Sequence, residues 1–145
     1  IKNSTLPIFD RDRNELQSTE FSFSRFLVPY LCDYEGYAIF MDCDMLVTHD
    51  IADLWEYRGG LNSASVVKHD YEQFKWTDEE SIGSLPGEWG YLVGEETVPE
   101  KLPKLIHWTP GGPYFKGFEH TLYANHWLDM MRKTVSATDP SVYIK

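Results

Sequence analysis

An apolar run that ends in two aspartates is the feature that most restricts what this chain can fold into. Residues 37–41, YAIFM, are continuously apolar, as the buried strands of parallel sheets are, and Asp42 and Asp44 follow directly. Because side chains alternate along a strand, both carboxylates are expected to project from the same side. Open α/β sheets bind ligands at the carboxyl ends of their strands, so the run predicts a site at this strand end.

The rest of the chain alternates helix-like and strand-like segments, which is typical of the α/β class. We expect a helix at 18–31 to bury one apolar stripe, with Pro29 kinking or shortening its last turn. Asp50 is expected to cap a second helix, at 51–57. Residues 72–104 are rich in Gly, Pro and Glu and are predicted to be mainly loops and short helical turns. The spacing of apolar side chains predicts helices at 18–31, 51–57 and about 119–133, and further strands at 63–67 and 104–108.

Composition restricts the domain count and the partners. With 145 residues, 42% of them hydrophobic, the chain can bury one sizeable core, so we predict a single domain over 1–145 with a tail from about 134. A formal net charge of -10 disfavours nucleic acid and anionic membrane surfaces as partners. No apolar stretch approaches the ~20 residues of a membrane span, and Cys32 and Cys43 form no CxxC pair. We therefore predict a cytoplasmic protein without an integral membrane segment.

The two aspartates allow a metal site, although their spacing alone is weak. Two ionised carboxylates this close repel each other, so the pair would bind a cation or share a proton. The same spacing recurs at Asp10 and Asp12 without an apolar run before it, where a solvated loop is the simpler interpretation. His107, near the end of a predicted strand, is the best third ligand, the alternative being a hydrogen-bonded structural histidine. Two oxygens and one nitrogen suit Mn²⁺ better than Mg²⁺, and Gly111 and Gly112 would let backbone amides approach a phosphate.

Four blocks of the chain, taken together, resemble the family 8 glycosyltransferases, in a bacterial or phage-like branch. The blocks are STEFSFSRFLVPYL, YAIFMDCDMLVTHDIADLW, IGSLPGEW and IHWTPGGPYF, and the match spans about residues 14 to 127. The resemblance implies an α/β fold with a Rossmann-like glycosyltransferase-A type sheet flanked by helices, here incomplete. It also implies a retaining transferase that uses Mn²⁺ or Mg²⁺. Such an enzyme moves a sugar from a nucleoside diphosphate sugar, with a UDP-sugar as the expected donor, to a saccharide or another hydroxyl acceptor.

The same resemblance assigns roles to individual residues. It implies a metal held by Asp42, Asp44 and His107. It implies donor-binding roles for Asp42, Gly111, Gly112 and Lys116, and catalytic roles for Arg25, Glu79 and Glu80. Without the resemblance, Arg25 is a surface or helix-capping cation and the two glutamates belong to a charged, solvated run. Further candidates, for stacking on sugar rings, are the aromatic side chains of Trp76, Trp89, Trp108 and Tyr114.

The chain also departs from that family, and two other functions stay open. We expect it to be shortened before Ile1, and between Tyr71 and Glu72, where relatives carry a further segment. Gly90 stands where relatives often have Asn. The first alternative is therefore a non-catalytic remnant that binds metal or nucleotide. The second is a haloacid dehalogenase-like phosphatase, because such enzymes also have two aspartates at this spacing after an apolar strand. It is disfavoured because they have Thr where this chain has Leu46.

Overall fold

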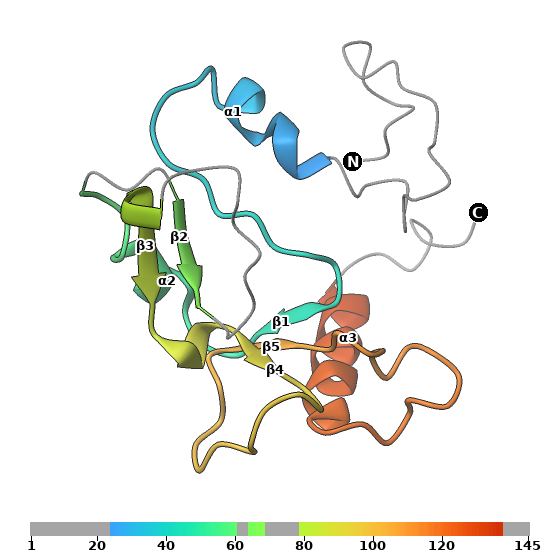
Figure 1. The fold of residues 1–145 in the computed structure, drawn as a ribbon. Coiled ribbons are helices and arrows are strands. Elements are labelled where there is room, and N and C mark those ends of the chain that lie inside the picture. Colours follow the sequence, from blue (N-terminus) through green and yellow to red (C-terminus); the bar gives the residue numbers. More distant parts are fainter. Residues whose placement is uncertain (1–23, 61–63, 69–78, 138–145) are drawn as a thin grey trace, which may run out of the picture. The chain divides into compact units, whose positions relative to one another are not determined.

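The computed structural model describes residues 24–60, 64–68 and 79–137 (Figure 1). The chain divides into two compact units, residues 1–42 and 43–145. The described elements are short helices and two small β-sheets, which confirms the predicted α/β class (Figure 1). Within these described ranges, no helix is both long enough and apolar enough to cross a membrane.

The first unit contains a short helical segment, made of the 3-10 turn η2 (Ser24–Leu27) and the helix α1 (Val28–Leu31). The α-helical part begins beside Pro29, where the missing N–H of a proline costs no hydrogen bond. The part of the predicted helix before Ser24 lies outside the described residues. From Ser24 to Leu31 the predicted buried stripe is wrong: Leu27 is buried, but the exposed side chains include Phe26, Tyr30 and Leu31. So short a helical segment buries little surface.

The predicted strand at 37–41 is wrong, and the strand lies on the other side of the aspartates. Residues 37–42 have no regular secondary structure, and Phe40 and Met41 are exposed. Strand β1 (Met45–Val47) follows a turn at residues 43 and 44. A strand forms only where a neighbouring strand completes its hydrogen bonds, and here it is β1 that has such a neighbour. The two aspartates therefore precede a strand, so strand alternation does not align their carboxylates.

The second unit contains two small sheets. In the first, β1 pairs antiparallel with β5 (Leu105–His107), and β5 pairs parallel with β4 (Tyr91–Leu92). In the second, β2 (Ala64–Val67) pairs parallel with β3 (Ile82–Leu85), and the 3-10 turns η3 (Glu79–Ser81) and η4 (Gly87–Trp89) flank β3.

These pairings confirm the strands predicted near 63–67 and 104–108. Of the loops and short helical turns predicted at 72–104, the turns are confirmed by η3 and η4, whereas the prediction is wrong for the strands β3 and β4. Both missed strands are short and lie among glycines and prolines, so their local sequence carries a weak signal. Their pairing with residues distant in the chain is what makes them strands.

Helix α2 (Ile51–Trp55) begins as the sequence predicts. The carboxylate of Asp50 accepts a hydrogen bond from the amide of Ala52 at 2.9 Å, which satisfies one of the free N–H groups of the first turn. Asp53 adds a negative charge in the same turn, where the helix dipole favours it. This helix is the next element after β1, which itself follows the two aspartates.

The core of the second unit joins the three-stranded sheet to helix α3 (Ala124–Ala137). Its buried side chains are Tyr91, Val93, Ile106 and Trp108, and Leu46, Tyr123 and Trp127 pack against them. The indole N–H of Trp108 donates to the carbonyl of Leu122 at 2.9 Å, so the residue after β5 is tied to the segment before α3. The helix begins at Ala124 rather than about 119, and it runs to Ala137, beyond the predicted start of the tail.

The two sheets of the second unit approach each other closely at Gly90. This residue precedes β4, and a Cβ atom built on it would lie 2.8 Å from the Cβ of Val67, the last residue of β2. Only a residue without a side chain fits this contact without a shift of Val67. The glycine that stands where family 8 relatives often have Asn is therefore required by the packing of this chain.

Candidate metal centre

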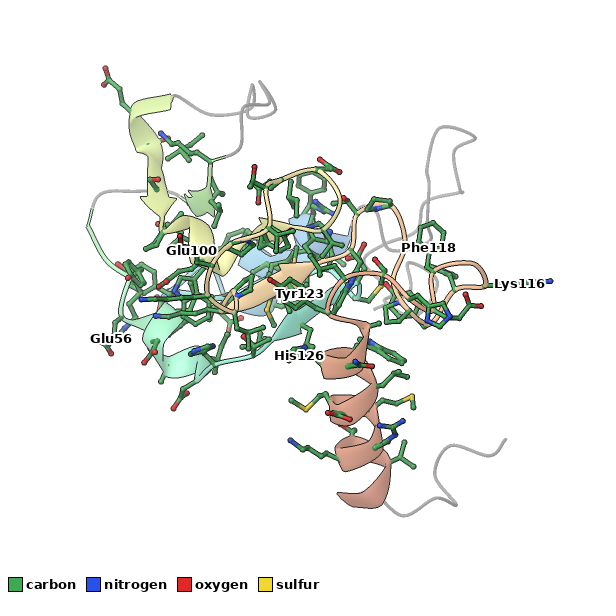
Figure 2. The ribbon with its side chains drawn as sticks, turned by 90° about the horizontal axis from the view of Figure 1, so that it is seen from below. Glu56, Glu100, Lys116, Phe118, Tyr123 and His126 are labelled. Atoms are coloured by element: carbon green, nitrogen blue, oxygen red, sulfur yellow. The ribbon has the colours of Figure 1, made fainter. Side chains whose placement is uncertain are left out.

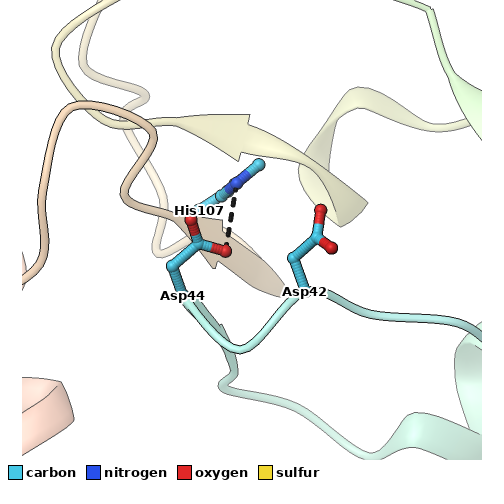
Figure 3. Close-up of side chains that lie close together, drawn as sticks. All are labelled: Asp42, Asp44 and His107. Atoms are coloured by element: carbon cyan, nitrogen blue, oxygen red, sulfur yellow. Dashed lines mark ion pairs between the residues drawn. The ribbon is translucent and has the colours of Figure 1, made fainter. Parts of the chain in front are cut away.

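Strand pairing brings Asp44 next to His107. In the antiparallel register of β1 and β5, Met45 lies opposite His107, and the amide of Trp108 donates to the carbonyl of Asp44 at 3.1 Å. The backbone of Asp44 is therefore held beside the end of β5. The carboxylate oxygen Oδ1 of Asp44 lies 3.3 Å from Nε2 of His107 (Figure 3).

The carboxylate oxygen at this contact is buried and has no hydrogen-bond partner. Oδ1 of Asp44 is inaccessible to solvent, and its approach to the imidazole lacks hydrogen-bond geometry. Removing a carboxylate oxygen from water without a replacement partner is costly, so such atoms usually indicate an ion, a water or a functional role. An oxygen and an imidazole nitrogen that face each other in this way are both suited to coordinate one cation.

Asp42 contributes a second carboxylate through the chain itself. It is the last residue of the first unit, and only Cys43 separates it from Asp44, so covalent connection limits the distance between the two side chains. One possible ligand atom from each of Asp42, Asp44 and His107 lies within 4.8 Å of the others (Figure 3). This set of two carboxylates and one imidazole, with its unpartnered oxygen, fits a divalent cation.

Arg25 binds Asp42 inside the first unit. Its guanidinium donates to Oδ1 of Asp42 at 3.0 Å and lies 5.3 Å from the centre of the Phe40 ring. Both members of the pair are partly open to solvent, with side-chain exposures of 48% for Arg25 and 27% for Asp42. The arginine that the resemblance places near the donor is thus joined to one of the three candidate ligands.

Gly111 and Gly112 make room for aromatic rings. The amide of Gly111 donates to the carbonyl of Trp108 at 3.2 Å, so this N–H already has a partner. A Cβ atom on Gly111 would lie 2.9 Å from the ring of Phe118, and one on Gly112 would lie 2.3 Å from the ring of Tyr114. This packing is the role that the structure gives the two glycines, and a contact of their amides with a phosphate stays a prediction.

The remaining predicted residues lie at other places in the second unit. Lys116 is exposed, and its side chain extends away from its loop (Figure 2). Glu80 is exposed on η3, the turn that precedes β3 of the two-stranded sheet. His107 belongs to the three-stranded sheet. Glu79 begins η3, and its side chain lies outside the described part.

Tyr114, one of the four aromatic residues that the sequence offers for contact with a sugar, lies near the candidate metal centre. Burial raises the pKa of its hydroxyl, and the negative charge of Asp44 and then that of Cys43 raise this pKa further. The electrostatic effect requires the hydroxyl to be close to Asp44. The signal in the sequence was its place directly after the PGGP turn that follows His107.

Fold and site together define an α/β protein with a candidate Asp-Asp-His metal centre. The chain is similar to Protein CDI of Arabidopsis thaliana, with 31% identity over 180 residues that cover 87% of this chain and 70% of the relative. The chain therefore belongs to the family of that plant protein. The aligned length exceeds the 145 residues of the chain, so the relative has additional residues inside the matched region. No family model and no solved structure matches the chain.

Proposed function

We propose that this protein is a metal-dependent retaining glycosyltransferase of glycosyltransferase-A type that uses a nucleoside diphosphate sugar. The observation that carries the proposal is the buried oxygen of Asp44, which faces the imidazole of His107 without a hydrogen bond. A cation would satisfy that oxygen. The resemblance of four blocks to family 8 glycosyltransferases supplies the reaction, because in those enzymes the corresponding residues bind the donor's metal.

Asp42, Asp44 and His107 would hold Mn²⁺ or Mg²⁺ in this proposal. A bound divalent cation supplies stabilisation of the negative charge that develops on the diphosphate leaving group. The imidazole of His107 must offer an unprotonated nitrogen, and both carboxylates must be ionised, so binding weakens in acid. Arg25, which holds Asp42 at 3.0 Å, carries a guanidinium that can pair with phosphate oxygens instead.

A non-catalytic protein that keeps the metal or nucleotide site is the second candidate. The observation that favours it is the alignment with the plant relative, which spans 180 residues and therefore includes residues that this chain lacks. The loss of such residues can remove part of a substrate site while the Asp-Asp-His group stays.

Calorimetric titration tests both candidates. Protein freed of metal by a chelator is titrated with MnCl₂, and then with UDP-glucose, GDP-mannose and CMP-sialic acid in the presence of Mn²⁺. We expect Mn²⁺ to bind, one of the two nucleoside diphosphate sugars to bind only with Mn²⁺, CMP-sialic acid with its single phosphate not to bind, and Asp44→Ala to abolish binding of both the metal and the sugar nucleotide. The matched control is Asp129→Ala, which removes an exposed carboxylate paired with Arg132 on α3.

The outcomes separate the candidates. Release of the sugar from the bound donor, to water or to a saccharide acceptor, supports the transferase. Binding without any release supports the non-catalytic protein. If neither Mn²⁺ nor a nucleotide binds, or if Asp44→Ala binds as the wild type does, the metal centre and both candidates are wrong.

A further inference from the structure

The loop after β5 holds one partly exposed aromatic ring beside the candidate metal centre. Of the four aromatic residues considered for sugar contact, Trp89 and Trp108 are only 3% and 1% exposed, so their ring faces are covered by protein. Trp76 lies outside the described residues. Tyr114 is 38% exposed and is the described member of this group that a ligand can reach.

Close packing fixes the ring of Tyr114. The atoms Cε1, Cζ and Oη lie 2.3, 2.5 and 2.8 Å from the place that a Cβ on Gly112 would occupy, so the hydroxyl end of the ring lies over this glycine. The ring centre is 5.3 Å from that of Trp127 on α3 and 4.8 Å from that of Phe115. A ring held on two sides loses little freedom when it binds a ligand, which favours binding.

Backbone hydrogen bonds connect the loop that carries this ring to Asp44. The amide of Trp108 donates to the carbonyl of Asp44, and the amide of Gly111 donates to the carbonyl of Trp108. Gly112, under the hydroxyl end of Tyr114, is the next residue. The raised pKa of Tyr114, caused first by burial and then by the charge of Asp44, agrees with this placement.

We propose that Tyr114 is a sugar-contacting residue, which binds the monosaccharide of the nucleotide sugar held at the Asp-Asp-His centre. This inference rests on the proposed function. In a nucleoside diphosphate sugar the monosaccharide is bonded directly to the diphosphate, so a cation at Asp44 brings the sugar within reach of the groups next to Asp44. A tyrosine presents an apolar ring face to the C–H groups of a pyranose and a hydroxyl to its O–H groups.

The test compares a nucleotide sugar with its own nucleoside diphosphate. Calorimetry in the presence of Mn²⁺ first identifies which of UDP-glucose, UDP-galactose and GDP-mannose binds most tightly. The affinity for this nucleotide sugar is then compared with the affinity for its nucleoside diphosphate, UDP or GDP. We expect Tyr114→Leu to weaken binding of the nucleotide sugar about 2- to 12-fold, the range for loss of an aromatic contact, and to leave the nucleoside diphosphate unchanged. Tyr114→Phe, which keeps the ring, should lose less. The control Tyr57→Leu changes another exposed tyrosine of the second unit and should have no effect.

A measurement on the unchanged protein covers the case in which Tyr114→Leu does not fold. In saturation-transfer NMR, irradiation of the aromatic protons should transfer magnetisation to the sugar protons of the bound ligand. Absence of that transfer, or a Tyr114→Leu variant that folds and keeps the full difference between nucleotide sugar and nucleoside diphosphate, overturns the inference while the proposed function stands. If no nucleoside diphosphate or nucleotide sugar binds with Mn²⁺, the proposed function fails and this inference fails with it.

Discussion

Oδ1 of Asp44 lies 3.3 Å from Nε2 of His107, and it is buried without a hydrogen bond. The pairing of β1 with β5 produces this contact, because it places the residue before one strand beside the last residue of the other. A carboxylate oxygen in this position lowers the stability of the protein until a partner arrives. If the proposed metal centre is correct, the protein should therefore become more stable when a divalent cation binds there.

Asp44→Asn should separate metal binding from folding. Mn²⁺ at about 100 times its dissociation constant should raise the free energy of unfolding of the wild type by about 2.7 kcal/mol and that of the variant by nothing. In EDTA the variant should be no less stable than the wild type, because it loses a charge whose buried oxygen, Oδ1, had no hydrogen bond. Urea denaturation with and without MnCl₂ measures both values, with Asp129→Asn as the control. Equal stabilisation of wild type and variant would contradict a metal ligand at Asp44.

Arg25→Gln should free the carboxylate of Asp42. The pair is partly exposed, so its loss should lower the free energy of unfolding by less than about 1 kcal/mol. Affinity for Mn²⁺ alone should rise, since Asp42 no longer pairs with a guanidinium, whereas affinity for a nucleoside diphosphate with Mn²⁺ should fall. Calorimetry measures both affinities. Arg58→Gln is the matched control, because Arg58 also pairs with a carboxylate, Glu56, and lies over an aromatic ring. An unchanged Mn²⁺ affinity in Arg25→Gln would rule out competition for Asp42.

Gly112→Ala should displace the ring of Tyr114. The new methyl group would lie 2.3 Å from Cε1 of that ring, and overpacking of this kind destabilises by about 1–3 kcal/mol. Adding Tyr114→Ala should recover part of the loss, and urea denaturation of the two single variants and the double variant measures the coupling. Gly87→Ala is the control, because no atom lies within 4 Å of its added Cβ. Additive effects of the two substitutions would show that the ring does not lie on Gly112.

Gly90→Asn, the residue that family 8 relatives often have, should destabilise this chain. The φ of Gly90 is -165°, an extended value that any residue adopts, so the cost comes from contact with Val67 and not from backbone strain. Gly90→Ala should cost about 1–3 kcal/mol, and Gly90→Asn should cost more because its side chain is larger. Val67→Ala should reduce both costs by removing the two γ-methyl groups. Wild-type stability of Gly90→Asn in urea would disprove the close contact of the two sheets.

Glu119 should make the loop that carries Tyr114 sensitive to acid. Backbone hydrogen bonds to its carboxylate, its own and that of the Gly117 amide at 2.8 Å, lower the pKa of Glu119 below the ordinary 4.5. A lowered pKa in the folded protein gives stability that is present above pH 4.5 and is lost as the pH falls through the folded-state value. Glu119→Gln should therefore be less stable than the wild type at pH 7, and this difference should shrink as the pH falls below 4.5. Urea denaturation across this pH range measures it. If the difference in stability does not change with pH, the loss of stability comes from the shape or hydrogen bonding of the Gln side chain and not from the lost charge of Glu119.

Local signals in the sequence predicted the elements whose cause is local. The cap at Asp50 depends on a hydrogen bond to a residue two positions away, and β2 and β5 are rich in apolar side chains, with Val66, Val67 and Ile106 β-branched. The short strands β3 and β4 lie among glycines and prolines and were predicted as loops. The apolar run at 37–41 has a strong strand signal, but it is Met45–Val47 that pairs with β5 and forms the strand.

The sequence by itself determined the chemistry available to this protein: two carboxylates two residues apart, a histidine in a strand-forming segment, and a glycine pair followed by an aromatic residue. Only the tertiary structure decided that Asp44 lies against His107, that its oxygen is buried, and that the ring of Tyr114 lies over Gly112. The physical reason is that strand pairing and burial join residues far apart in the chain. No window of neighbouring residues contains the partners that set these contacts.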